Sequence, residues 1–394
     1  MIELPFPVLD ADNHFYETKE SFTRHLPRKY QSQLQYVEVE GRTRLAIGNL
    51  ISDYVPNPTF SRVASPGVWD AWNRGTNTAG LSQREMTGKP IEPPMSFRTG
   101  SERIKLLDEQ GIQSALMFPT LASAIEERMG YDHDLLHAAT HALNQWIFDE
   151  WGFGRDGRIY AVPFVTLANV DQALVELEWI IKNGAKAIGI RPAPVPGYRG
   201  TRSFGFPEYD PFWARVAEAR LLVCMHSSDS GYDRFTRMWE GGSELLPFEG
   251  NPFRDMQRIY FRAIEDSVAA LICHGVFDRH PQLRVACIEN GSDWVAPMLK
   301  HFKHIYGQMP QAFKKDPVEV FRKHIFVSPY YEEDIIALSE NIGVNRVLFG
   351  SDFPHPEGLG NPRDYAVEIK DMKTVDQAAI MGGNLQSLLK GVCL

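Results

Sequence analysis

The sequence lacks the features of a nucleic-acid-binding or membrane-embedded protein. Its 394 residues include 41 lysines and arginines against 50 aspartates and glutamates, with no run of basic residues. A chain with this net charge of −9 does not attract phosphate backbones or acidic lipids, so we expect neither nucleic acid nor a membrane among its partners. No segment approaches the roughly 20 apolar residues needed to span a bilayer. The first residues lack a basic start and an apolar core, so we expect no secretory signal and a cytoplasmic location.

Cysteine is scarce, and the four residues Cys224, Cys273, Cys287 and Cys393 form no Cys-x-x-Cys pair. We therefore expect neither a disulfide framework nor a zinc site built from thiolates. Internal repeats, low-complexity segments and the glycine fingerprint of a dinucleotide-binding site are also absent. What remains is a chain with 43% hydrophobic residues, enough to form one large core.

Short apolar, β-branched runs alternate with amphipathic helical segments, which is typical of parallel βα units. We predict strands at residues 8–12, 114–118, 159–165, 187–190, 222–226, 284–289, 325–328 and 346–350. We predict helices between them at residues 170–183, 211–220, 262–277, 293–306 and 332–341. This alternation predicts an α/β fold, a (β/α)8 or TIM barrel, in which residues 1–394 form a single domain. The active site of such a barrel lies in the loops at the carboxyl ends of its strands.

Residues 15–100 do not belong to a minimal barrel. They separate the first two predicted strands, are rich in proline, asparagine, arginine and aromatic residues, and contain a candidate hairpin at 36–47. A loop this long in a compact enzyme usually serves as a lid, a binding loop or an oligomer contact. We therefore predict an insertion or lid here and expect a dimer or larger assembly.

Polar residues follow three of the predicted strands. Asp12 and His14 alternate at the end of the first strand, so both should point into the barrel mouth. His226 ends the fifth strand and Asp352 follows the eighth. Taken singly, each has an ordinary structural interpretation, such as a buried histidine bonded to backbone or a turn cap. Together they predict a site for a divalent ion such as Zn²⁺, Mn²⁺ or Fe²⁺.

Four stretches occur in the order typical of one enzyme family. They are Asp-Ala-Asp-Asn-His at 10–14, the strand end at His226, Gly-Val-Phe-Asp-Arg-His-Pro at 275–281 and Gly-Ser-Asp-Phe-Pro-His at 350–355. In these the chain resembles the amidohydrolase superfamily, and within it amidohydrolase family two, the branch around aminocarboxymuconate semialdehyde decarboxylase. The resemblance implies that one metal ion is bound by Asp12, His14, His226 and Asp352.

Two residues depart from the family pattern. Asp12 stands where the first histidine of a His-x-His pair is usual, and Glu289 stands where the decarboxylase has a histidine at the end of the sixth strand. Glu289 has three interpretations: a base that activates water, a ligand that helps to hold a second metal ion, or an ion-pair partner of a barrel arginine such as Arg191. Arg191 at the fourth strand end is a candidate clamp for a substrate carboxylate, and His355 is a candidate substrate contact.

The resemblance implies a metal-dependent hydrolase or non-oxidative decarboxylase that acts on a small organic acid or amide through metal-bound water. Zinc is the expected ion, with iron and manganese as alternatives, and the candidate catalytic residues are Glu289, Asp352 and His226. A carboxylate-rich site is also compatible with a non-haem iron oxygenase of this fold, with one or two ions, or with a metal-bearing partner subunit of such a complex. A homo-dimer or a hetero-oligomer with a related subunit is therefore expected.

Overall fold

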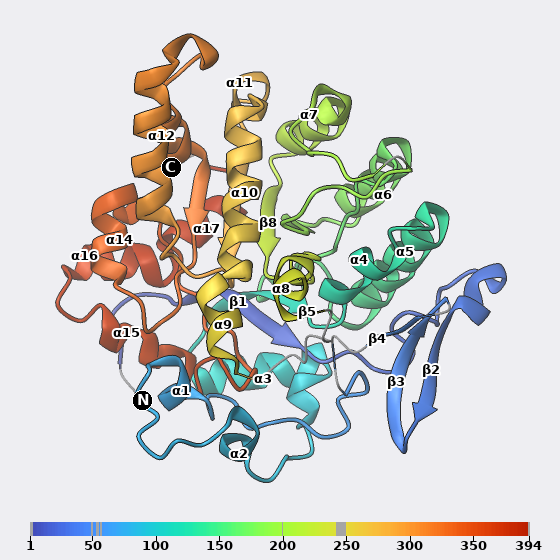
Figure 1. Cartoon of the computed structure of the whole chain (residues 1–394). Helices are drawn as coiled ribbons and strands as arrows, with labels where there is room; N and C mark the ends of the chain where they lie inside the picture. Colours follow the sequence, from blue (N-terminus) through green and yellow to red (C-terminus); the bar gives the residue numbers. More distant parts are fainter. Residues whose placement is uncertain are drawn as a thin grey trace.

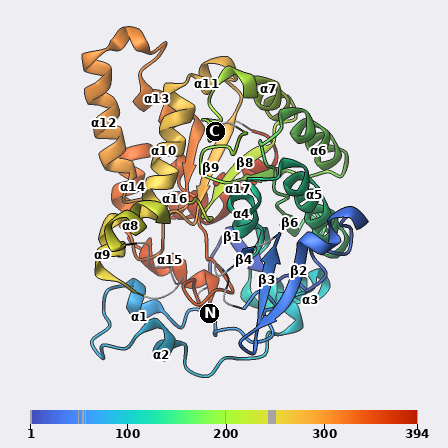
Figure 2. The same ribbon diagram turned by 45° about the vertical axis from the view of Figure 1, so that its right-hand side comes forward.

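The computed structural model describes residues 3–48, 50–52, 55, 57–198, 200–241 and 250–392, and Cys393 lies outside them. Parallel strands occupy the centre of the molecule and helices surround them, as the two views in Figures 1 and 2 show. Among the described residues, no helix is long and apolar enough to cross a membrane.

Two parallel sheets form this centre. One, of order β1-β5-β6, consists of β1 (Leu9–Phe15), β5 (Ser114–Pro119) and β6 (Ile159–Ala161). The other, of order β10-β9-β8-β7, consists of β7 (Ala187–Ile190), β8 (Leu222–His226), β9 (Arg284–Ile288) and β10 (Ile325–Val327). Nearly all of these residues are buried, which explains why the strands read as continuous apolar runs. Seven of the predicted strands are thus confirmed, although the ends of five of them differ.

The predicted eighth strand at 346–350 is wrong. Leu348 does donate its backbone N–H to Val327 of β10 at 2.9 Å, as a strand neighbour would. The next N–H, that of Phe349, instead donates to the carbonyl of Ile380 at 3.1 Å, so a regular ladder does not form. The third predicted strand is shorter than expected for a related reason, since a proline, which has no N–H, stands at position 163.

Isolated parallel bridges connect the two sheets at both edges. They pair Phe164 with Gly189, Val327 with Val347, and Asn13 with Phe353. Buried side chains from both sheets also form one shared cluster of Leu9, Ala11, Leu116, Phe118, Val162, Ala187, Leu222, Cys224, Ala286, Ile288, Phe326, Leu348, Leu385 and Leu388. The inner faces of all seven strands except β6 contribute to it, and Val162 directly follows β6. The strands therefore surround a common interior.

The longer helices pack on the outside of these strands. They are α3 (Gly100–Gln110), α5 (His133–Glu150), α6 (Val170–Lys182), α7 (Asp210–Glu218), α10 (Ile259–Cys273), α12 (Val295–Gln308), α13 (Pro317–His324) and α14 (Ile335–Ile342). The five predicted helices are found, although their ends differ and one of them is divided. The predicted helix 262–277 is two helices, because Gly275 adopts a left-handed φ of 71° between α10 and α11 (Val276–Arg279).

The chain between β1 and α3 forms a separate layer. A small antiparallel sheet of β2 (Leu34–Val39), β3 (Arg42–Ile47) and β4 (Leu50–Ser52) confirms the predicted hairpin and adds one strand. It projects at one side of Figure 1, whereas α1 (Asp70–Asn73) and α2 (Gln83–Thr87) lie along the lower edge of the molecule in that view.

Candidate metal centre

Four donor atoms converge at the carboxyl ends of three parallel strands. Asp12 and His14 come from β1, His226 ends β8 and Glu289 directly follows β9, and their donor atoms all lie within 4.8 Å of one another. Nε2 of His14 is 3.4 Å from Oδ1 of Asp12 and 3.3 Å from Oε2 of Glu289. The Nε2 atoms of the two histidines are 3.1 Å apart. Ligands at about 2.1 Å from an ion are roughly 3.4 Å apart in a tetrahedron, so these spacings fit one divalent ion.

The bonding of these side chains also fits a metal site. Oδ1 of Asp12 and Oε2 of Glu289 are buried beside imidazole nitrogens without forming a hydrogen bond of regular geometry. Nδ1 of His226 lies 2.8 Å from the carbonyl oxygen of Ser227, to which it donates, so the lone pair of Nε2 faces the other donors. The residues present therefore fit a divalent ion held by two carboxylates and two imidazoles.

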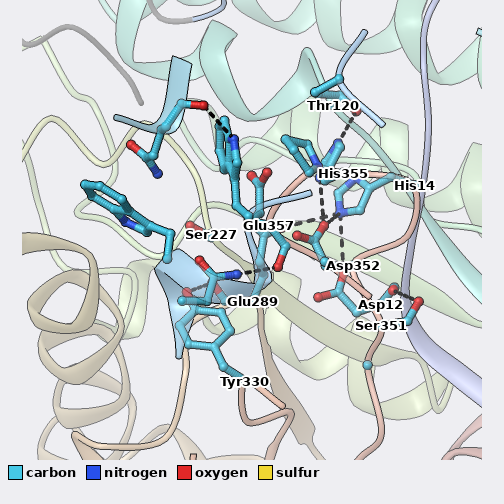
Figure 3. A pocket seen from close by; sticks show the side chains of 18 of the residues that line it. Asp12, His14, Thr120, Ser227, Glu289, Tyr330, Ser351, Asp352, His355 and Glu357 are labelled. Carbon is cyan, nitrogen blue, oxygen red and sulfur yellow. Dashed lines mark hydrogen bonds and ion pairs between the residues drawn. The ribbon is translucent and has the colours of Figure 1, made fainter. Parts of the chain in front are cut away.

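Asp352 lies at the edge of this group. Its Oδ1 is 3.5 Å from Nε2 of His14 and 2.7 Å from Nδ1 of His355. Nε2 of His355 in turn contacts Oγ1 of Thr120 at 3.2 Å. A second set of donors, which overlaps the first, consists of His14, Glu289, Asp352 and His355, whose donor atoms lie within 4.8 Å of one another. Figure 3 shows Asp352 and His355 beside His14. The structure thus groups the predicted ligands Asp12, His14 and His226 with Glu289, whereas the predicted ligand Asp352 belongs to the second set.

The pKa shifts in the donor group are those expected of a cation-binding site. Burial by itself favours neutral His226, but the nearby Glu289 and Asp12 carboxylates outweigh it and raise the pKa of His226 to about 10. Burial, reinforced by the charge of Glu289, raises the pKa of Asp352 well above its ordinary value. Protons are therefore retained where the carboxylates lie close together. A bound divalent ion would supply the same positive charge in place of these protons.

Two of these residues have an unusual backbone conformation. Glu289 has a φ of 55° and Asp352 a φ of 53°, in the left-handed region that residues other than glycine rarely adopt. The carbonyl of Glu289 accepts a hydrogen bond from the Tyr330 hydroxyl at 3.0 Å, and the N–H of Asp352 donates to the carbonyl of Asp12 at 2.8 Å. Such conformations persist where surrounding contacts impose them, and they cluster at functional sites.

A second buried carboxylate fixes the ligand-bearing segments to each other. Asp10 accepts hydrogen bonds from the N–H of Asp12 at 3.1 Å and from the side-chain amide of Asn13 at 2.9 Å. It also accepts from the N–H of Ser351 at 3.0 Å and from its hydroxyl at 2.5 Å. One carboxylate therefore ties the end of β1 to the segment that carries Asp352.

Arg191 is not brought to this site. It is 3% exposed and is not among the residues that line the cavity described below. Its guanidinium donates to Glu127 at 2.6 Å and to the carbonyl of Asp229 at 3.1 Å. The predicted ion pair between Glu289 and Arg191 is likewise not found, because Glu289 contacts the two histidines. Arg191 therefore forms hydrogen bonds within the fold and does not contact the cavity.

The donor group opens into a cavity of about 930 Å³. Its walls include the donors themselves, the segment between β1 and α3, and the loops after β8, β9 and β10. Aromatic side chains form much of the wall: Tyr16, Phe60, Trp69, Trp72, Phe261, Tyr330 and Tyr331. A volume of this size accommodates a small molecule.

Sequence reasoning missed three carboxylates in this cavity, those of Asp255, Glu332 and Glu357, of which Glu357 acts electrostatically on Asp352. Glu357 lines the cavity, and burial, with the charge of Glu289 next in importance, raises its pKa to about 7. Figure 3 shows it among the pocket side chains together with Asp352 and His355. It lies five residues after Asp352 in a glycine- and proline-rich turn, a pattern that does not by itself indicate a functional residue.

Comparison with known proteins gives a consistent result. A family profile described as amidohydrolase matches residues 98–389. The chain is also similar to the solved structure of an amidohydrolase from Mycobacterium avium subsp. paratuberculosis K-10, with 39% identity, 98% of each chain covered and a TM-score of 0.93.

More distant structures share the fold. A dihydroxybenzoic acid decarboxylase from Polaromonas sp. JS666, with bound manganese and the inhibitor 2-nitroresorcinol, has 16% identity and a TM-score of 0.59 over 98% of this chain and 97% of its own. A 5-carboxyvanillate decarboxylase from Novosphingobium aromaticivorans DSM 12444, complexed with manganese and 4-hydroxy-3-methoxy-5-nitrobenzoic acid, has 16% identity and a TM-score of 0.60 over 98% and 96%.

Proposed function

The chain belongs to the amidohydrolase family, a family of metal-dependent hydrolases and carboxy-lyases, and from this premise we propose that it hydrolyses or non-oxidatively decarboxylates a small organic acid or amide. The observation that carries the proposal is the convergence of Asp12, His14, His226 and Glu289 at the end of a small-molecule cavity. When bound there, a divalent ion supplies Lewis acidity and offsets negative charge on the substrate.

The protein's own residues divide the remaining tasks. Asp12, His14, His226 and Glu289 hold the ion, with His226 oriented by the Ser227 carbonyl. Asp352, which His355 holds by a hydrogen bond, exchanges the proton. In hydrolysis its carboxylate accepts a proton from the attacking water and passes it to the leaving group. In decarboxylation its carboxyl delivers a proton to the carbon from which CO₂ departs.

The fold supports this assignment. The isolated bridges between the two parallel sheets and their shared interior support a (β/α)8 barrel, and the donors stand at the carboxyl ends of the parallel strands. The segment between β1 and α3 contributes Phe60, Trp69 and Trp72 to the cavity wall, which supports its role as a lid. We further propose that the chain assembles as a homo-dimer or with a related subunit, which sedimentation at micromolar concentration tests.

Metal analysis of protein purified without added metal tests the proposal first. We expect about one divalent ion per chain, and zinc or manganese supports hydrolysis or decarboxylation. Manganese is present in two of the similar structures, and oxygen ligands shift preference from zinc toward manganese and iron. Iron would instead favour the alternative, a non-haem iron oxygenase.

A substrate screen separates these reaction classes. Small amino, hydroxy and aromatic acids and their amides are incubated with the metal-loaded protein with and without O₂. We expect turnover that does not depend on O₂, with CO₂ or a hydrolysed amide as product. Turnover that stops without air and consumes one O₂ per product would instead establish an oxygenase.

A further inference from the structure

Glu357 is a carboxylate of the cavity that the mechanism above does not use. Its Oε2 is buried and, among the described residues, has no hydrogen-bond partner. The charges that act most strongly on its carboxyl are those of Glu289, His14 and Asp12, all members of the donor group. A buried acceptor without a hydrogen bond destabilises the fold, so its persistence requires an explanation.

The backbone around Glu357 holds the side chain in this place. Three consecutive carbonyls, those of residues 355–357, accept hydrogen bonds from Gly67 N–H at 3.2 Å, Trp69 N–H at 2.9 Å and the Asn73 side-chain amide at 2.7 Å. Gly358 packs tightly against the backbone of the preceding turn. A Cβ added at this glycine would lie 2.4 Å from the carbonyl oxygen of Asp352. The loop therefore cannot shift to carry Glu357 toward solvent without breaking these contacts.

The cations around the cavity have other partners or lie at its rim. Arg254 donates to Glu240 at 2.7 Å, Arg258 pairs with Asp293 at 3.2 Å, and the side chain of Arg62 is exposed. None of the three is among the main charges that act on Glu357. A stabilising ion pair within the described part of the chain therefore does not account for its position.

We propose that Glu357 is a substrate-binding residue, whose carboxylate accepts a hydrogen bond from a hydroxyl, amino or amide N–H group of the bound molecule. The inference rests on the proposed function, because it takes the donor group as the place where the reacting end of the substrate binds. It narrows the substrate class to compounds that carry such a donor near the carboxyl or amide that reacts. A site built to accept a hydrogen bond discriminates strongly against an analogue that lacks the donor.

The test compares ligands that differ only in that donor. Benzoates with a hydroxyl, an amino or a methyl group at position 2 or 3 are titrated by calorimetry into manganese-loaded protein. The proteins are the unmodified chain, Glu357→Leu, Glu357→Gln and the control Glu340→Gln, whose glutamate is exposed on α14. Hydrogen bonds to a charged group contribute about 1.5–3 kcal/mol, which corresponds to roughly 10- to 150-fold in affinity.

We expect hydroxy- or aminobenzoates to bind at least tenfold more tightly than methylbenzoates to the unmodified chain and to Glu340→Gln. In Glu357→Leu this preference should disappear, and in Glu357→Gln it should be reduced. Equal binding of donor and methyl compounds, binding of no compound, or an unchanged preference in Glu357→Leu overturns the inference.

Metal content, measured on the same samples, keeps the two proposals separate. Glu357→Leu should retain its manganese, and loss of the ion in that variant would make Glu357 a ligand and overturn the inference. An unmodified chain that binds no divalent ion contradicts the proposed function instead. The donor preference is then measured on the metal-free protein by the same criterion, so that the role of Glu357 is still decided.

Discussion

At the scale of single residues, Glu289 combines a left-handed backbone with a carboxylate shared between two histidines. Its Oε2 lies 2.9 Å from Nε2 of His226 and 3.3 Å from Nε2 of His14. Burial alone would raise the pKa of Glu289, but the two histidines outweigh burial and hold it well below its usual range. The side chain therefore stays ionised in the group and is better placed as a ligand than as a proton carrier.

Glu289→Gln tests that assignment. The amide is nearly isosteric but removes one negative charge from the donor group, so we expect the fold to be kept while manganese affinity falls at least tenfold and activity falls with it. Calorimetric titration of the ion and a turnover assay at saturating metal measure the two effects. Asp371→Asn, which neutralises an exposed carboxylate, serves as the control. Full metal content with lost activity would return Glu289 to the role of a base.

The convergence of Asp12, His14 and His226 was predictable from the sequence, because each stands near the end of an apolar strand. The carboxyl ends of parallel strands meet at the same edge of a sheet, and Glu289, for which the sequence left three roles open, directly follows β9 there. Glu357 was not predictable. Its position depends on hydrogen bonds to residues 67–73, almost 300 positions earlier in the chain, and no local pattern reports such contacts. The prediction for Arg191 was wrong for a similar reason, since its partners Glu127 and Asp229 lie 64 and 38 positions away in the chain.

At the scale of elements, the close approach of β1 to the segment after β10 depends on Gly350. An added Cβ at that position would lie 2.4 Å from Oγ of Ser328 and 2.6 Å from Cβ of Asp12. Gly350→Ala should therefore displace Asp12, weaken manganese binding at least tenfold and lower the melting temperature.

Gly307→Ala provides the matched comparison for that variant. Gly307 is exposed on α12, and an added Cβ there meets no atom within 4 Å. Alanine should stabilise the helix by about 0.5–1 kcal/mol and leave manganese binding unchanged. Equal metal affinity in the two variants would show that the contact with Asp12 is not tight.

A hydrogen bond between two helices gives stability a pH dependence. Nε2 of His137 on α5 accepts from the N–H of Asn169, the N-cap of α6, at 3.1 Å. Burial, with the charge of His133 next in importance, lowers the pKa of His137 to about 4. Because this pKa is below the value of about 6.5 in an unfolded chain, protonation favours unfolding. The contribution is complete above pH 6.5 and is lost as the pH falls toward 4.

His137→Gln tests this link. Glutamine can accept the same hydrogen bond but does not titrate, so the loss of unfolding free energy between pH 6.5 and 4.5 should be smaller than in the unmodified chain. Urea denaturation at several pH values measures it, with the exposed His301→Gln as control. If the unfolding free energies of all three proteins fell equally with pH, His137 would not contribute to the pH dependence.

The elements themselves were predicted unevenly. Buried runs such as 187–190 and 222–226 were placed to the residue, because burial on both faces leaves a sharp compositional signal. The segment 346–350 carries the same signal without forming a strand. Its burial is real, but the N–H of Phe349 is directed to the carbonyl of Ile380, and composition does not record the direction of a hydrogen bond.

At the scale of the whole molecule, one ion would connect strands that lie far apart in the sequence. Its ligands come from β1, β8 and the end of β9, so an ion bound to the folded chain has no equivalent site in the unfolded one. Binding at a free concentration 100 times the dissociation constant stabilises the fold by about 2.7 kcal/mol. Removal of the metal with a chelator should therefore lower the melting temperature of the entire molecule.

Scanning calorimetry with manganese and with chelator measures this effect. We expect a single transition that shifts by several degrees, and re-addition of manganese should restore it. Asp12→Asn should show a smaller shift, because it lacks one of the charged ligands. A melting temperature that is the same with and without the ion would contradict a site formed between strands.

The scatter of the ligands along the chain has a consequence for how the protein is made. Synthesis delivers Asp12 and His14 first, His226 more than two hundred residues later and Glu289 last. On a nascent chain Asp12 and His14 provide only two of the four donors, so we expect them to bind an ion weakly. The last donor leaves the ribosome only when most of the chain has been translated. We therefore expect an ion to enter a fold that is nearly complete, through the cavity lined by aromatic side chains.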